Sequence, residues 1–90
     1  MERLLYFKIA SCPYCKAAEN WIDELIDEYP EYKEVEFKVI DEQIETELAN
    51  SYDYYYVPTF FCGNKKIHEG AATKEKIKAV LDYALKETTV

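Results

Sequence analysis

The chain has 90 residues, the length of one domain, and its 11 basic and 18 acidic residues give a formal net charge of −7. Because phosphate groups repel a chain this acidic, the charge argues against nucleic acids and anionic membranes as partners. Apolar residues make up 49% of the chain, which excludes intrinsic disorder and supplies one compact core. We therefore expect a single domain over residues 1–90, working as a monomer.

Three cysteines are too few, and odd in number, for a secreted miniprotein held together by disulfides. The apolar stretch near the N-terminus runs only from Leu4 to Phe7, too short for a signal-peptide core or a membrane span. We therefore expect a cytoplasmic location. In that reducing compartment a close cysteine pair is more often catalytic or metal-binding than structural.

The first half of the chain predicts two strands, each followed by a helix. Residues 3–9 are a short apolar run, typical of a buried strand. Helical spacing of apolar residues then predicts a helix that begins at Pro13, which suits the first helical position, and stops at Pro30. Alternating apolar and polar residues predict a strand over 35–39, and Asp41 is a candidate N-cap for the second helix. The thin apolar stripe of that second helix consists of Ile44, Leu48, Ala49 and Tyr52.

The second half predicts a hairpin and a last helix. Residues 57–62 form a third strand, Gly63-Asn64 is a hairpin turn signal, and residues 65–69 form the return strand. Thr73 caps the final helix. A helical crossover makes the first strand pair parallel, whereas the tight turn makes the last pair antiparallel. The order β-α-β-α-β-β-α therefore predicts an α/β domain with a four-stranded mixed sheet flanked by helices.

Cys12 and Cys15 stand where the first strand passes into the first helix. At the helix cap, Cys12 meets unpaired backbone N–H groups and the positive end of the helix dipole, both of which stabilise a thiolate. Cys15 lies inside the first turn, where it can reach Cys12 but is less exposed. We therefore expect Cys12 to attack a substrate disulfide and Cys15 to release the resulting mixed disulfide.

The segment Cys-Pro-Tyr-Cys at 12–15, after an N-terminal strand, resembles the dithiol motif of glutaredoxins in the thioredoxin-like superfamily. Val57-Pro58-Thr59 resembles the cis-proline segment of that superfamily, and the order of elements matches over nearly the whole chain. The resemblance implies a thioredoxin-like fold and a thiol–disulfide oxidoreductase. It implies that Pro58 is cis, facing the cysteines, and that the backbone of Val57 pairs with a bound thiol peptide as an added strand would. No bound cofactor is implied; glutathione is the possible co-substrate, and disulfide-containing proteins or glutathione mixed disulfides are the substrates.

Aromatic residues are expected to line the substrate groove. Tyr14, beside Pro13, lies between the two cysteines, and Tyr56 is next to Val57. A tyrosine offers a flat apolar face with a polar tip, which suits a binding rim. The cluster at 52–56 has two interpretations, a binding rim or aromatic cover for the end of the sheet.

Charged residues near the site also have alternative roles. Lys8 is expected either to stabilise the Cys12 thiolate or meet a substrate carboxylate, or to be a solvated strand end. The acidic residues of the first helix predict a solvated face that favours basic or neutral partners. They are Glu19, Asp23, Glu24, Asp27 and Glu28.

Some positions depart from the glutaredoxin pattern for binding glutathione. Glutaredoxins usually carry a basic residue three positions before the first cysteine, where this chain has Ile9. Gly70 and Thr73 match the later glutathione-binding stretch, but Lys74 places a cation where an acid would meet the glutathione amino group. These departures, and Thr59 after the proline, favour an alternative: a thioredoxin-like reductase of protein disulfides supplied by a flavoprotein reductase.

A third hypothesis is a metal or iron–sulfur binding module. Cys62 and His68 could complete a Cys₃His set with the cysteine pair, and a cluster could bridge two subunits through Cys12. The proline inside the pair favours redox chemistry instead, so we predict no metal site. In that case Cys62 is a small buried residue of a central strand and His68 a surface residue.

Overall fold

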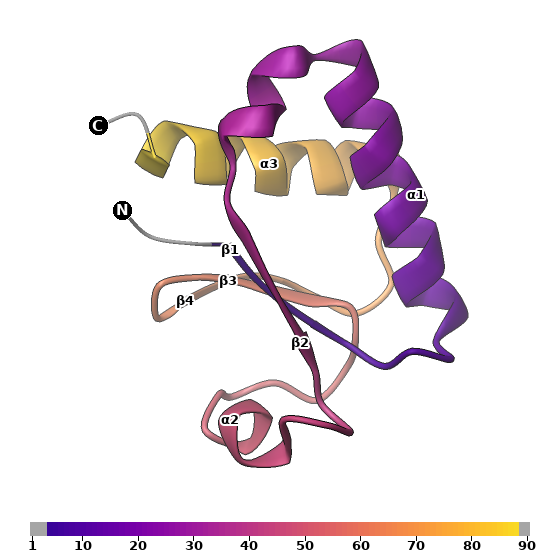
Figure 1. Cartoon of the computed structure of the whole chain (residues 1–90), viewed down its shortest axis with the longest axis vertical. Coiled ribbons are helices and arrows are strands. Elements are labelled where there is room, and N and C mark those ends of the chain that lie inside the picture. The colour runs from indigo at the N-terminus through magenta and orange to yellow at the C-terminus, as the bar shows by residue number, and fades with distance from the viewer. Residues whose placement is uncertain (1–3, 89–90) are drawn as a thin grey trace.

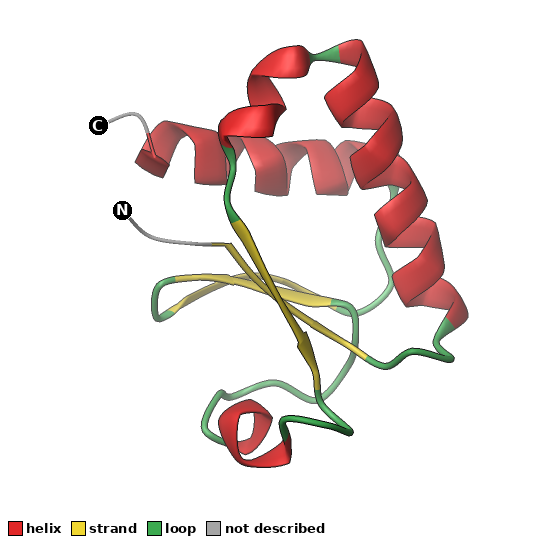
Figure 2. Ribbon diagram, viewed as in Figure 1, coloured by secondary structure: helices red, strands yellow, loops and turns green. Residues whose placement is uncertain are grey.

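The fold is a four-stranded mixed sheet between helices, seen in a computed structural model that describes residues 4–88. Helices α1 and α3 cover one face of the sheet, and the short helix α2 lies under the other (Figures 1 and 2). Within the described part of the chain, no helix has the length and apolar character needed to cross a membrane. The elements are β1 (Leu4–Lys8), α1 (Pro13–Glu28), the 3-10 helix η1 (Pro30–Glu34), β2 (Phe37–Asp41), α2 (Thr46–Asn50), β3 (Thr59–Cys62), β4 (Lys65–Glu69) and α3 (Lys74–Thr88).

The strand order is β2-β1-β3-β4. Strand β1 pairs in parallel with β2 and antiparallel with β3, and β3 pairs antiparallel with β4 through the turn at Gly63-Asn64. Gly63 has a φ of 60°, a conformation that favours glycine in tight hairpin turns. The predicted α/β class, mixed sheet and element order are confirmed.

Alternating side chains of β1 separate two cores. Leu4 and Tyr6 point toward α1 and α3, whereas Phe7 points toward α2. On the α2 side, Phe7 packs with Phe61 and Ile40, and its ring lies against tyrosines of the loop before β3. Both faces of the central strands are therefore apolar, and all four residues of β3 are buried.

Several predicted boundaries were wrong. Strand β1 ends at Lys8, not at residue 9, and Asp41, the candidate N-cap, is the last residue of β2, whereas Glu45 stands at the N-cap of α2. Strand β2 begins at Phe37, not at residue 35, because η1 occupies the connection after α1 and Val35 fills the core without joining the sheet. The second helix begins only at Thr46, and residues before it form a turn in which Ile44 is 79% exposed. Ile44 therefore does not belong to the predicted apolar stripe, whereas Leu48, Ala49 and Tyr52 pack in the core on the α2 side of the sheet. Strand β3 begins at Thr59, not at residue 57, since Pro58 has no N–H to donate to a neighbouring strand. Residue 3 of the predicted first strand lies outside the described residues.

Candidate active site

The two cysteines lie at the first turn of α1. Cys12 is the N-cap, and its Sγ accepts a hydrogen bond from the backbone N–H of Cys15 at 3.4 Å. The two cysteines approach to 3.3 Å. Cys12 is partly exposed, while Cys15 is fully buried against the core under α1. The structure therefore has the predicted asymmetry between an accessible and a covered sulfur.

Burial changes the acidity of Cys15. Removal from water raises the pKa of its thiol to about 11, opposed by a hydrogen bond with the backbone of Ile9, while the neighbouring Cys12 raises it further. A thiol in this environment is protonated at neutral pH. Cys15 must therefore lose a proton before it can act as a nucleophile.

The loop before β3 faces Cys12. The peptide bond between Val57 and Pro58 is cis, as the resemblance implied. The Cys12 thiol donates to the carbonyl oxygen of Val57 at 4.0 Å. Pro58 is buried, whereas Tyr14 and Tyr56 are 61% and 70% exposed. The backbone of Val57 thus lies beside the accessible sulfur, and the exposed residues Tyr14 and Tyr56 are sequence neighbours of Cys15 and Val57.

The tyrosine cluster divides into packed and exposed residues. The ring centroids of Tyr52 and Tyr54 lie 5.0 and 4.8 Å from that of Phe7, and the two rings cover the core on the α2 side of the sheet. Tyr55 and Tyr56 are 84% and 70% exposed. The first two tyrosines therefore cover the end of the sheet, and the last two are exposed, so a binding rim stays a prediction for Tyr55 and Tyr56.

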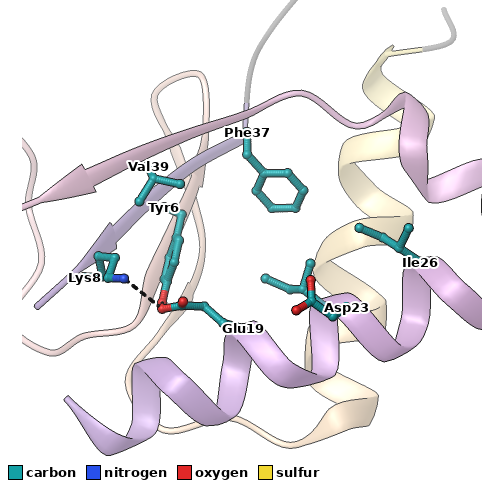
Figure 3. Close-up of a pocket in the computed structure, with 8 residues that line it drawn as sticks. Tyr6, Lys8, Glu19, Asp23, Ile26, Phe37 and Val39 are labelled. Carbon is teal, nitrogen blue, oxygen red and sulfur yellow. Dashed lines mark hydrogen bonds and ion pairs between the residues drawn. The ribbon is translucent and has the colours of Figure 1, made fainter. Parts of the chain in front are cut away.

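Lys8 and Lys74, the two lysines near the expected glutathione site, are paired with carboxylates of α1. Lys8 Nζ lies 3.1 Å from Glu19 Oε2 (Figure 3). Seven residues, or about 10 Å along the helix, separate Glu19 from Cys12. Lys74 Nζ lies 3.1 Å from a carboxylate oxygen of Glu24 and 2.5 Å from one of Glu28, which ties the start of α3 to α1. The α1 acids Asp23, Glu24, Asp27 and Glu28 are exposed, as predicted, and two of them pair with Lys74.

Gly70 and Thr73 hold the fold near the site. The backbone N–H of Gly70 donates to the carbonyl of Pro58 at 2.8 Å, and a φ of 89° makes glycine the suitable residue there. The Thr73 hydroxyl accepts from the N–H of Lys76 at 3.2 Å and caps α3. Gly70 is thus next to the site, and Thr73 acts as the predicted cap.

Tyr6 was missed as a neighbour of the cysteines. Its buried hydroxyl donates to Glu19 Oε2 at 2.8 Å and to the Cys15 carbonyl at 3.2 Å. Burial, and then the bond to Glu19, raise the pKa of Tyr6. The sequence could have indicated this position of Tyr6, because side chains alternate between the two faces of β1 and Tyr6 and Lys8 lie on the face that α1 covers.

A groove of about 420 Å³ opens between β2 and α1 beside this network (Figure 3). Figure 3 shows the Glu19 carboxylate between the Tyr6 hydroxyl and Lys8. The groove is lined by Tyr6, Lys8, Glu19, Ile22, Asp23, Ile26, Phe37 and Val39.

The family of the chain follows from its sequence as well as from this geometry. The sequence profile of the Thioredoxin family matches residues 2–83. The chain belongs to the thioredoxin family. No curated protein sequence matches it. Family membership and the close cysteine pair together indicate a thiol–disulfide oxidoreductase.

Solved structures agree with this assignment. Oxidized thioredoxin O1 from Arabidopsis thaliana is 26% identical over 94% of this chain and 78% of its own, with a TM-score of 0.63. A malarial protein is 18% identical over 94% of this chain and 98% of its own, with a TM-score of 0.68. Zinc-bound human ERp44 is 20% identical over 97% of this chain but only 26% of its own, with a TM-score of 0.60. The last two share the thioredoxin fold with this chain.

The fold does not bring together the four side chains considered as metal ligands, Cys12, Cys15, Cys62 and His68. Cys62 is buried and pairs with Leu4, at the opposite end of β3 from Thr59. His68 is partly buried, and its Nε2 lies 2.8 Å from the carbonyl oxygen of Gly70. Among residues 4–88, no three His, Cys, Asp or Glu side chains are grouped closely enough to hold a metal ion.

Proposed function

We propose that this thioredoxin-family protein reduces disulfide bonds in proteins by a dithiol mechanism. The observation that carries the proposal is the partly exposed Cys12 at the helix cap, beside the Val57 backbone and in front of the buried Cys15. The Cys12 thiolate attacks one sulfur of the substrate disulfide, and the other substrate sulfur leaves as a thiolate that takes up a proton. Deprotonated Cys15 then attacks Cys12 Sγ. The Cys12–Cys15 disulfide forms, the second substrate thiol is released, and the substrate has gained two electrons.

The substrate in this proposal is an extended peptide segment carrying the disulfide. Among residues 4–88, the Val57 N–H has no hydrogen-bond partner, and its carbonyl has only the long contact with Cys12. A substrate strand could pair with both groups, as in other cases of strand addition. Tyr14 and Tyr56, with Pro13 between the cysteines and Pro58 beneath the loop, would line that groove.

For the electron donor we favour a flavoprotein disulfide reductase. Lys8, the lysine considered for a substrate carboxylate, is already paired with Glu19, and Lys74 places a cation where an acid would meet the glutathione amino group. The thioredoxin family match supports the same choice.

A glutaredoxin driven by glutathione is the second candidate. The Cys-Pro-Tyr-Cys segment with its exposed Tyr14 favours it. The Lys8 and Glu19 side chains are 21% and 39% exposed, so water and small solutes reach the pair. A glutathione carboxylate could therefore compete with Glu19 for Lys8.

Two assays separate these candidates. We expect the protein to catalyse reduction of insulin disulfides by dithiothreitol, and to give little turnover of a small glutathione mixed disulfide coupled to glutathione reductase. The opposite pattern would make it a glutaredoxin. Cys12→Ser should abolish both activities, whereas Cys15→Ser should accumulate a mixed disulfide with the substrate. Turnover that survives Cys12→Ser would contradict the assigned nucleophile.

We also propose a cytoplasmic monomer that works without a bound cofactor. Size-exclusion chromatography with light scattering should give the mass of one chain. The purified protein should be colourless and free of zinc. Stoichiometric zinc, or the brown colour of an iron–sulfur cluster, would support the binding module instead.

A further inference from the structure

The carboxylate of Glu69, at the end of β4, reaches the loop before β3. Its Oε2 accepts hydrogen bonds from two consecutive backbone N–H groups, those of Tyr55 at 2.5 Å and Tyr56 at 3.0 Å. Its Oε1 accepts from Lys66 Nζ at 2.8 Å. Lys66 Nζ also donates to the carbonyl of Asp53 at 3.1 Å. One ion pair on β4 therefore holds three residues of the loop.

Besides these bonds, the outer part of the loop is held by the Thr59 hydroxyl, which donates to the carbonyl of Tyr56. The side chains of Tyr55 and Tyr56 are 84% and 70% exposed, so apolar burial does not fix the backbone there. The bond to Lys66, and then that to the N–H of Tyr55, lower the pKa of Glu69 to about 2. The carboxylate is thus ionised at any pH at which the protein works, and hydrogen bonds to a charged acceptor are stronger than neutral ones.

The held residues lead directly to the accessible cysteine. Tyr56 precedes Val57, whose carbonyl oxygen is 4.0 Å from Cys12 Sγ. On the other side of Val57, the N–H of Gly70, the residue after Glu69, holds the carbonyl of Pro58 at 2.8 Å. The end of β4 therefore fixes the backbone both before and after Val57.

We propose that Glu69, supported by Lys66, is a positioning residue that holds the loop from Asp53 to Val57 in the conformation that receives the substrate strand beside Cys12. The inference rests on the proposed reduction of protein disulfides. Glu69 touches neither sulfur; it acts through the backbone of Tyr55 and Tyr56. Its loss should weaken binding of extended substrates and leave the reactivity of Cys12 itself unchanged.

Amide hydrogen exchange tests the anchor directly. In Glu69→Ala, exchange at Tyr55 and Tyr56 should accelerate about tenfold, as expected when a hydrogen bond to a charged group is lost. Glu69→Gln keeps an acceptor oxygen and should give a smaller change. Glu87→Gln, which removes an equal charge from an exposed position on α3, is the control and should exchange like the wild type. Unchanged exchange in Glu69→Ala would overturn the proposal.

Steady-state kinetics test the role in the reaction. With a peptide disulfide as substrate, Glu69→Ala should raise KM about tenfold and change kcat less than about twofold, in line with the same lost interaction. Alkylation of Cys12 by iodoacetamide should proceed at the wild-type rate. Lys66→Met should raise KM less than Glu69→Ala does, because the carboxylate keeps its bonds to Tyr55 and Tyr56.

The outcomes distinguish the two proposals. An inactive wild-type protein refutes the proposed function, and with it any role of Glu69 in that reaction. An active wild type with the same KM in Glu69→Ala refutes the positioning role alone. A slower alkylation of Cys12 in Glu69→Ala would also refute it, because the effect would then reach the nucleophile rather than the substrate groove.

Discussion

Cys15 makes the stability of the reduced protein depend on pH. Its pKa is about 11 in the folded protein against an ordinary value of 9.0, so the folded state holds the proton more tightly. The resulting stabilisation is complete below pH 9 and is lost as the pH rises through 11. We expect about 3 kcal/mol of the free energy of unfolding to disappear over this range.

Urea unfolding at pH 8 and pH 11 checks this prediction, with a phosphine keeping the thiols reduced. The Cys15→Ala variant is the control, because it keeps Tyr6 and every other group that titrates in the same range. The wild type should lose more stability than the variant between the two pH values. Equal losses would show that Cys15 ionises as easily folded as unfolded.

Exposure of the three thiols predicts the order of their modification. Only Cys12 is partly exposed, whereas Cys15 and Cys62 are buried at 0% and 4% exposure. Brief treatment of the reduced protein with iodoacetamide should therefore give a single adduct on Cys12, located by peptide mass spectrometry. Cys12→Ser should stay unmodified over the same time. Early labelling of Cys62 would contradict the packing of β3.

At the scale of elements, Phe7 joins β1 to the loop that carries the site. Its ring is fully buried and lies 4.8 Å from Tyr54, 5.0 Å from Tyr52 and 5.7 Å from Phe61. Replacing it with alanine should lower the free energy of unfolding by about 3–5 kcal/mol, because a cavity opens beneath the loop. Tyr55→Ala, at an exposed ring of the same loop, should change it by less than about 0.5 kcal/mol. Urea denaturation of both variants measures the difference, and similar effects would contradict the division of the tyrosine cluster.

Sequence patterns predicted those helices, strands and turns that depend on residues close together in the chain. The turn glycine, the prolines that bound α1 and the cysteine spacing each act within a few residues, so the element order and the cysteine geometry followed from them. The start of β2 did not, because Val35 continues the alternation although its side chain belongs to the core beyond the sheet. The partners of Lys8 and Glu69 were also hidden, since they lie 11 and 13–14 residues away in the sequence and become neighbours only in the fold.

For the whole molecule, net charge should select among substrates. The protein carries a net charge of −7, and α1, which Cys12 caps, is rich in acidic residues. A cationic peptide disulfide should therefore be reduced faster than a neutral one at low salt, because the field of the protein attracts it. Raising the ionic strength from 10 mM to 500 mM shortens the screening length from about 30 Å to a few ångströms and should remove most of that advantage. Comparing kcat/KM for the two peptides at both salt concentrations is the test; an equal salt effect on both would exclude electrostatic steering.

The strand order has a consequence for the behaviour of the protein in a crowded solution. Both outer strands carry lysines at exposed positions, Lys38 on β2 and Lys65 and Lys66 on β4. If two copies paired edge to edge, their outer strands would bring these ammonium groups together. Exposed charges on edge strands commonly prevent such aggregation. The same lysine that steadies the substrate loop, Lys66, would thus also help to keep a high concentration of the protein from forming continuous β-structure.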